Sequence, residues 1–418
     1  MRRIVLLVIC GLLLTTACDR SGDGLVGKTT IRFWNGFTGP DGRTMLQIVK
    51  RFNDANPDLN VIMQRMEWGT YYNKLFVAGL SGRAPEVFVS HSYALRRFMG
   101  AGFVRPVDDL IGVGEGKLDP ADFDANVLAN LETGGQHWGI PLDVHPLGMF
   151  YNKTMFKLAG IVDEKGEARP PRNREEFMEA CRKLTDRKRS QWGFVFTWQR
   201  TNCFSVVRQF GGRLADPLSG EPTMALRANV EALDWCATLV REKLVPAPQD
   251  FNAWIGFRQG KVGMAFEGIY MMPDLVKQEE LDWGAAPMPV LGKEPAAWGE
   301  THSMVLRKDL EGKKLDGAKR LIRYLSDHSL EWAAAGQVPV RKSLRESDVF
   351  KKMYAQSQFA KEIPYISYLP ASTYVFEFLT EWDLAVELVL RGTLTAEDAL
   401  RQAQEKMVRI AGRAGGGA

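Results

Sequence analysis

Short apolar runs alternate with longer amphipathic stretches over the first hundred residues of the chain. Residues 30–34 alternate like a short strand, and apolar residues then recur at helical spacing up to a stop at residues 56–57. Further strands are predicted at 61–63 and 86–90, with a helix over 71–80 between them. Because strands and helices alternate with short connections, we expect a parallel sheet covered by helices.

The same alternation restarts in the middle of the chain. Two short apolar strands, 138–142 and 148–151, flank a connection at 143–146. The remaining predicted elements are strands at 192–196, 262–266, 283–288 and 302–306, and helices at 174–185, 229–243, 315–326 and 330–335. Residues 349–407 have helical character interrupted by prolines, and residues 413–418 are expected to be disordered. A chain of 418 residues can bury the cores of two such α/β lobes.

The N-terminus carries an export signal. Arg2 and Arg3 precede an apolar run of about 11 residues, well short of the roughly 20 that a transmembrane helix needs. Small residues then lead into Cys18, and residues 14–18 resemble a bacterial lipobox. We therefore expect a signal peptide over 1–17, lipidation of Cys18 and a flexible tether over 18–27. An ordinary secretory peptide that happens to contain a cysteine is the alternative.

Composition narrows the function classes. Lysine and arginine total 54 against 50 acidic residues, and no dense basic and aromatic stripe accompanies this small excess, so nucleic acid is not an expected partner. Three cysteines lie beyond the export segment, and an odd number cannot all pair. Cys181 and Cys236 lie in helical patterns that favour buried thiols. No metal-ligand spacing is present among the cysteines, so we expect no metal and no cofactor.

Several segments resemble the bacterial extracellular solute-binding proteins of the sugar-transporter type, the group with maltose-, glycerol-phosphate- and oligogalacturonide-binding members. The resemblance lies in the order and spacing of short segments over nearly the whole mature chain. These segments are 31–39, 52–57, 84–88, 139–141, 150–153, 159–161, 170–177, 257–264, 286–289, 318–325 and 337–339.

This resemblance implies a two-lobed α/β fold of the type II periplasmic binding proteins, in which each lobe is a mainly parallel sheet flanked by helices. It places lobe one at 28–142 plus 298–336 and lobe two at 143–297 plus 337–412. It also implies a monomeric substrate-binding component of an ABC importer, with no enzymatic activity, that captures a carbohydrate and delivers it to the permease by hinge closure. Lipidated Cys18 would hold it in the periplasm or at the cell surface, on the outer face of the cytoplasmic membrane.

Candidate ligand-binding residues follow from the chemistry of a sugar. Sugar hydroxyl groups need hydrogen-bond partners, and the apolar ring face stacks on aromatic side chains. Such side chains follow the predicted strands or lie at the predicted lobe crossings. They are Trp34, Phe37, Glu67, Trp68, His91, Tyr93, Asp143, His145, Trp198, Asn202, Trp254, Glu267, Tyr270, Trp298 and His302. Three of the five histidines fall in this set.

The predicted mechanism has the solute bridge the lobes. Trp34, Glu67 and His91 would bind from one side, and His145, Trp198 and Glu267 from the other. Paired carboxylates leave a glycoside-acting enzyme as one alternative, and a carbohydrate sensor or adhesion lipoprotein of the same fold is another. Arg65, Arg96 and Arg97 leave an anionic solute open, although solvated surface charge explains them as well.

Overall fold

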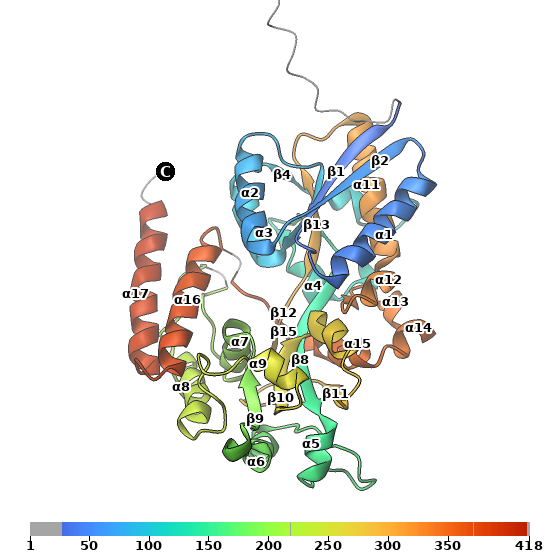
Figure 1. The fold of residues 1–418 in the computed structure, drawn as a ribbon. Helices are drawn as coiled ribbons and strands as arrows, with labels where there is room; N and C mark the ends of the chain where they lie inside the picture. The colour runs from blue at the N-terminus through green and yellow to red at the C-terminus, as the bar shows by residue number, and fades with distance from the viewer. Residues whose placement is uncertain (1–26, 218, 371, 416–418) are drawn as a thin grey trace, which may run out of the picture.

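The chain folds around two sheets, each with its own helices (Figure 1). The computed structural model describes residues 27–217, 219–370 and 372–415. The predicted signal peptide and the predicted lipidation site at Cys18 lie outside the described residues.

The first sheet has the strand order β2-β1-β3-β13-β4, with β7 paired to β13. Its strands β1 and β2, and β1 and β3, run parallel, whereas β13 runs antiparallel to β3. The strands are β1 (Thr29–Asn35), β2 (Leu59–Arg65), β3 (Val87–His91), β4 (Val104–Arg105), β7 (Ile140–Pro141) and β13 (His302–Arg307). The helices of this part are α1 (Pro40–Ala55), α2 (Trp68–Leu80), α3 (Ser92–Gly100), α4 (Ala125–Ala129), α11 (Gly312–Asp327) and α12 (Ser329–Ala333). A small ribbon of β5 (Glu132–Thr133) and β6 (Gln136–His137) lies beside them.

Strand β1 shows how the sequence pattern builds this part. Ile31 and Phe33 are fully buried in a cluster that includes residues of α1 and α11, whereas Trp34 packs on the opposite face with residues of α2 and α3. Successive side chains of a strand point to opposite faces, so helices must cover both faces. Figure 1 shows α2 and α3 on one side of this sheet and α1 and α11 on the other.

The second sheet has the order β15-β12-β8-β10-β9, and β11 and β14 also pair with β8. Its strands are β8 (Asp143–Asn152), β9 (Trp192–Phe196), β10 (Val262–Gly268), β11 (Trp283–Ala286), β12 (Ala297–Glu300), β14 (Val338–Pro339) and β15 (Ile366–Ser367). Its helices are α5 (Lys153–Leu158), α6 (Arg174–Leu184), α7 (Gln199–Gln209), α8 (Arg227–Arg241), α9 (Ala253–Arg258), α10 (Met272–Leu275), α13 (Lys342–Arg345), α14 (Asp348–Lys351), α15 (Tyr354–Phe359), α16 (Val375–Leu390) and α17 (Ala396–Gly415). Every residue of β8 is buried, as its central position requires.

The chain passes between the two sheets three times, and these passages differ in detail from the sequence-based boundaries. Residues 143–146, expected as a connection, form the first part of β8. Strand β12 pairs with β8 and β15, so the second passage falls at Thr301 rather than before residue 298. The third follows α12 and leads into β14. At the C-terminus, α17 continues to Gly415 and therefore replaces part of the expected disorder.

The three cysteines beyond the export segment, Cys181, Cys203 and Cys236, are free and buried, as the sequence analysis predicted for the two in helical patterns. Among the described residues, no helix combines the length and the apolar character needed to cross a membrane.

Candidate functional site

Three histidines meet where the chain passes between the two sheets. His91 ends β3 and His302 begins β13, and the two are direct partners in that antiparallel pair. His145 comes from β8 of the second sheet, and its ring stacks on that of His302 with centroids 4.3 Å apart. One ring nitrogen of each histidine lies within 4.8 Å of one ring nitrogen of the others. Three predicted site residues from distant parts of the sequence therefore form one cluster, the histidine cluster.

Asp143, at the start of β8, holds two of these rings in place. Its carboxylate accepts hydrogen bonds from Nδ1 of His302 at 2.8 Å, from Nδ1 of His145 at 3.1 Å and from the indole N–H of Trp332. The carboxylate is completely buried. Burial alone would raise the pKa of Asp143, but electrostatic attraction to His302 and the hydrogen bonds from His145 and His302 hold that pKa far below its ordinary value. The backbone N–H of His302 also donates to it, at 3.3 Å, so Asp143 is an ionised buried group that accepts from donors on three different elements.

Two of the histidines are neutral at neutral pH. Burial, followed by repulsion from His302 and His145, lowers the pKa of His91 well below its ordinary value. Burial and then His302 lower the pKa of His145 to about 4, although Asp143 opposes the shift. Each neutral ring carries one N–H donor and one lone pair, and its Nδ1 is already engaged, by Tyr72 in His91 and by Asp143 in His145. One nitrogen of each ring is therefore left to form a hydrogen bond with a solute.

Aromatic rings surround the histidine cluster. Trp68, the first residue of α2, stacks on His302 with centroids 5.5 Å apart and planes 10° apart. Tyr93 stacks on His91 at 5.4 Å and 11°. From the second sheet, Trp298 and Tyr270 approach His145 edge-on at 6.0 and 6.1 Å. Both lobes thus contribute flat apolar surfaces beside polar groups, the combination that sugar rings require.

Phe37 lies deeper than its predicted role as a ligand-stacking residue requires. The residue is completely buried, and its ring packs on Trp68, His302 and Trp332. Phe37 therefore packs beneath the rings of Trp68 and His302 rather than facing a ligand.

Two buried glutamates of the second sheet lie at the ends of their strands. Burial raises the pKa of Glu267, in β10, to about 8, against the opposing hydrogen bond from the backbone N–H of Gly268. Burial likewise raises the pKa of Glu300, in β12, to about 8, although Ser92 donates to it from both its backbone and its hydroxyl group. Glu300 is the register partner of His145. A glutamate of the second sheet therefore hydrogen-bonds to the first turn of α3, across the passage between the lobes.

Several buried polar atoms in this region have no hydrogen-bond partner within the described part of the chain. An unpaired buried polar group is costly, so such atoms concentrate where a ligand supplies the missing bond. They come from both sides of the passage, and include Oε2 of Glu267, Oε1 of Glu300, Oδ1 of Asn202, Nε1 of Trp298 and Oγ of Ser303.

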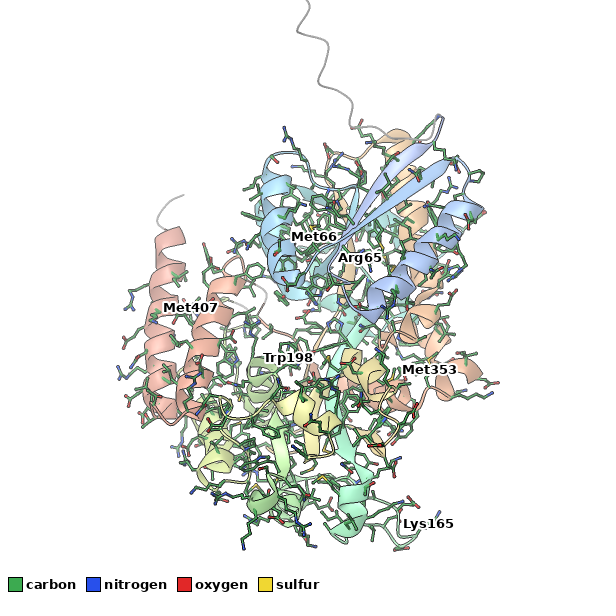
Figure 2. All side chains as sticks on the ribbon, in the orientation of Figure 1. Arg65, Met66, Lys165, Trp198, Met353 and Met407 are labelled. Atoms are coloured by element: carbon green, nitrogen blue, oxygen red, sulfur yellow. The ribbon has the colours of Figure 1, made fainter. Side chains whose placement is uncertain are left out.

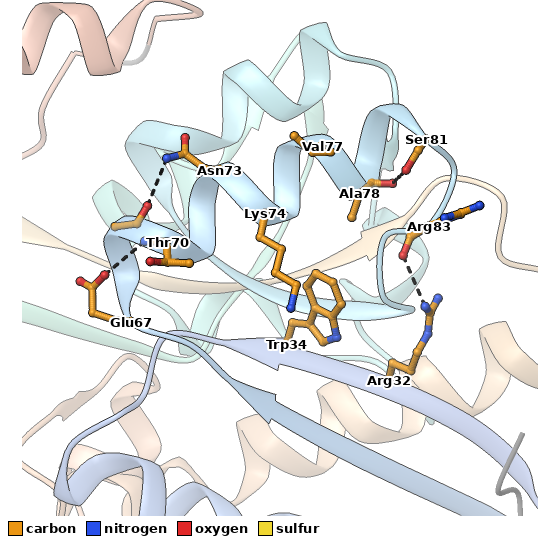
Figure 3. Close-up of a pocket in the computed structure, with 11 residues that line it drawn as sticks. Arg32, Trp34, Glu67, Thr70, Asn73, Lys74, Val77, Ala78, Ser81 and Arg83 are labelled. Carbon is orange, nitrogen blue, oxygen red and sulfur yellow. Dashed lines mark hydrogen bonds between the residues drawn. The ribbon is translucent and has the colours of Figure 1, made fainter. Parts of the chain in front are cut away.

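Trp34 and Glu67 do not join the histidine cluster, contrary to the sequence-based expectation. They line a separate groove of about 960 Å³ on the first lobe alone, between β1 and α2 (Figure 3). There the ammonium group of Lys74 lies 5.3 Å from the ring of Trp34, and Glu67 caps α2 by accepting from the backbone N–H of Thr70 at 3.1 Å. Trp34 belongs to β1, and its side chain points to the α2 face of the sheet, whereas Glu67 is exposed and serves the helix terminus.

The remaining candidates divide between the site and the core of lobe two. Trp198 is 51% exposed and precedes α7 on the side of the second lobe that faces the first (Figure 2). Its side chain is near enough to Glu267 to oppose the rise in that pKa. Asn202, also in α7, donates to the carbonyl of Phe266 at 3.2 Å. Trp254 instead stacks on Phe257 within α9 at 5.6 Å, so its surroundings are those of a packing residue.

Sequence reasoning missed two residues of the site. Trp332 is not among the predicted site residues; it is completely buried, and its indole N–H donates a hydrogen bond to Asp143. Nothing in a helical pattern distinguishes such a tryptophan. Glu300 had a usable signal, since it stands two residues before His302 in a polar run at a predicted crossing.

Gly36 offers a direct test of the aromatic packing. A Cβ atom at this position would lie 2.1 Å from the ring of Trp68, so alanine must push the indole off His302. We expect Gly36→Ala to lower the free energy of unfolding by about 1–3 kcal/mol and to change the near-UV circular dichroism. The control is Gly412→Ala in α17, where a Cβ atom meets nothing within 4 Å and stability should not fall. Equal stability and spectra for both variants would contradict the described packing.

Solved structures show which class of protein has this fold. An ABC substrate-binding protein from Listeria monocytogenes, solved in complex with cycloalternan, superimposes with a TM-score of 0.79 at 20% identity, and the match covers 92% of this chain and 99% of that one. The architecture is that of the two-domain solute-binding proteins, and it confirms the predicted fold class.

Sequence comparisons identify the family. The profile described as "Bacterial extracellular solute-binding protein" matches residues 37–329. This protein belongs to the bacterial extracellular solute-binding proteins, as its segment pattern predicted. The maltotriose-binding protein of Pyrococcus abyssi is 21% identical over 269 residues, which is 64% of this chain and only 55% of that protein. The arabinooligosaccharide-binding protein of Halalkalibacterium halodurans is 25% identical, over 92% of this chain and 90% of that protein.

Proposed function

We propose that this protein captures a carbohydrate between its two lobes and delivers it to the permease of an ABC importer. The observation that carries the proposal is the mixture of aromatic faces and unpartnered buried polar atoms, contributed by both lobes at one place. Sugar rings stack on such faces, and sugar hydroxyl groups pair with such atoms. The relatives named for maltotriose and arabinooligosaccharide support an oligosaccharide as the solute.

The proposed mechanism is hinge closure. We assign lobe one to residues 28–142 and 301–336 and lobe two to residues 143–300 and 337–415, with the hinge at the three passages. Contacts between the lobes outside the hinge include Arg97 with Glu377 at 3.7 Å and the ring of Phe376 with Tyr93 at 6.1 Å. A solute that contacts both lobes stabilises the closed arrangement because only that arrangement gives it all of its contacts.

The proposal also covers where the protein works. The family is extracellular, and the sequence before the described residues has the features of a lipoprotein signal. We therefore propose that lipidated Cys18 anchors a monomeric binding protein to the outer face of the cytoplasmic membrane, next to its permease.

Titration calorimetry tests solute capture. The mature protein, freed of metal with a chelator, is titrated with maltotriose, an arabino-oligosaccharide and glycerol 3-phosphate. We expect an oligosaccharide to bind, and Trp198→Ala to weaken that binding by about 1–3 kcal/mol because a large half-exposed ring is lost from the site.

Trp254→Ala is the matched control, since the same truncation falls in α9 and should change stability without changing affinity for the oligosaccharide. If glycerol 3-phosphate is the only one of the three solutes that binds, the proposed carbohydrate is wrong and the solute is anionic. Release of free sugar from an added oligosaccharide, with no stable complex, would favour the glycoside-acting alternative and contradict the transport proposal.

A further inference from the structure

The histidine cluster has the composition of a transition-metal site. His91, His145 and His302 each place one ring nitrogen within 4.8 Å of the others, and no other group of three such residues was found in the described part of the chain. Imidazole is a preferred ligand of Zn²⁺, Cu²⁺ and Ni²⁺. Sugar binding alone does not explain why three imidazole rings contact one another.

The hydrogen bonds behind the rings leave one nitrogen of each histidine available. Nδ1 of His145 and Nδ1 of His302 are both engaged by the carboxylate of Asp143, and Nδ1 of His91 is engaged by the hydroxyl group of Tyr72. The nitrogen that remains on each ring is Nε2. Metal-binding histidines characteristically have the other ring nitrogen bonded to a carboxylate or another polar group, which fixes the tautomer and the ring orientation.

At all three histidines, the tautomer that the hydrogen bonds allow leaves Nε2 free to bind a metal ion. With the proton on Nδ1, His145 and His302 donate to Asp143 and present the Nε2 lone pair. The hydroxyl oxygen of Tyr72 already accepts from the backbone N–H of His91 at 3.1 Å, and it can accept from Nδ1 of that ring as well. In this arrangement no ligand nitrogen carries a proton.

From these contacts we propose that His91, His145 and His302 bind one divalent transition-metal ion of the zinc type through their Nε2 atoms. Asp143 acts as the positioning residue for two of the three rings. Zinc–nitrogen bonds of about 2.0–2.1 Å put tetrahedral ligand atoms about 3.3 Å apart, so small shifts of the rings would accompany binding. Three protein ligands leave the fourth position open to water or to an oxygen atom of a solute. The expectation of no metal, which rested on cysteine spacing, is revised by this proposal.

The site connects the two lobes, because His91 and His302 come from the first sheet and His145 comes from the second. A bound ion would therefore restrict the hinge as well as the site. This inference does not depend on carbohydrate capture, which is measured on metal-free protein.

Cobalt titration of the mature, metal-free protein tests the proposal. We expect one equivalent of Co²⁺ to produce the intense visible absorption of a four-coordinate site, and one equivalent of Zn²⁺ to abolish it. His91→Gln should weaken cobalt binding by about 100-fold or more, since loss of even a hydrogen-bond partner behind a ligand costs about 10–100-fold. His91 is the only partly exposed member of the cluster, so its replacement disturbs packing least.

The control is His137→Gln, which removes a histidine that pairs with Asp108 outside the cluster and should leave cobalt binding unchanged. X-ray absorption at the zinc edge of the unmodified protein provides a readout that needs no variant, and three imidazole ligands are expected. Absence of a visible band in the unmodified protein, equal affinity in His91→Gln, or fewer than three imidazoles at the zinc edge would each overturn the proposal.

Discussion

Replacing Asp143 by alanine is expected to lower the free energy of unfolding by about 3–5 kcal/mol, the largest effect of any single substitution considered for this protein. The carboxylate is completely buried, and it accepts from His145, from His302 and from the indole of Trp332. The backbone N–H of His302 donates to the carboxylate as well, so alanine leaves four donors without this acceptor and opens a gap between β8, β13 and α12. Urea unfolding of the two proteins at pH 7 measures the difference.

Asp108→Ala is a matched control because it removes another aspartate that pairs with a histidine. Asp108 bonds to His137 at 2.8 Å, but both side chains reach solvent, so the expected loss is below about 1 kcal/mol. Asp143→Asn keeps one carbonyl acceptor and should fall between the two. If Asp143→Ala loses no more stability than Asp108→Ala, the hydrogen bonds to Asp143 do not stabilise the fold where the chain passes between the lobes.

The second large effect is a fall in stability with rising pH that Glu362 causes. Burial raises the pKa of this carboxyl group to about 7, against the opposing hydrogen bond from the backbone N–H of Met288. A carboxyl group with a raised pKa in the folded state contributes its stability below the unfolded value of 4.5, and that contribution is lost as the pH rises through 7. Between pH 5 and pH 8.5 the unmodified protein should therefore lose up to about 3 kcal/mol that Glu362→Gln retains.

Denaturant unfolding of both proteins across this pH range measures the effect. Glu362→Gln keeps a side-chain oxygen that can accept from the backbone N–H of Met288. Glu267 and Glu300 have pKa values raised to about 8 and add to the same trend in both proteins, so the comparison isolates one carboxyl group. The control is Glu179→Gln, because an exposed carboxyl group with a lowered pKa does not titrate in this range. Parallel pH profiles for Glu362→Gln and the unmodified protein would contradict the prediction.

The sequence predicted the fold class well because local signals and topology agree. Apolar runs with strand spacing alternate with amphipathic stretches, and this alternation suffices for a helix-covered sheet. The connection expected at 143–146 is instead strand, for a physical reason. Asp143, His145 and Pro146 have the composition of a loop, but each lies in a buried strand whose polar groups find partners in β13 and α12. Only tertiary contacts satisfy these groups, so composition could not reveal the strand.

The candidate site was predicted in part. Histidines are scarce in this chain, and three of them stand at strand ends, so their convergence followed from topology. Trp34 lies apart from the histidine cluster because β1 continues through Asn35, and the two-residue period then turns the indole to the α2 face. Glu67 lies apart from the cluster because its carboxylate caps the N-terminus of α2. In both cases a local structural role accounts for a residue that its position had assigned to the ligand.

The pairing of β13 with β3 has a consequence for how the chain acquires its structure. His302 pairs with His91, so the first sheet cannot be completed until some two hundred further residues have been made. The central strand β8 likewise waits for β14, near residue 338. Strand pairs so distant in sequence form slowly. Neither sheet can be completed while only a short nascent chain is available. Both sheets therefore reach their final strand order only after most of the chain has been synthesised.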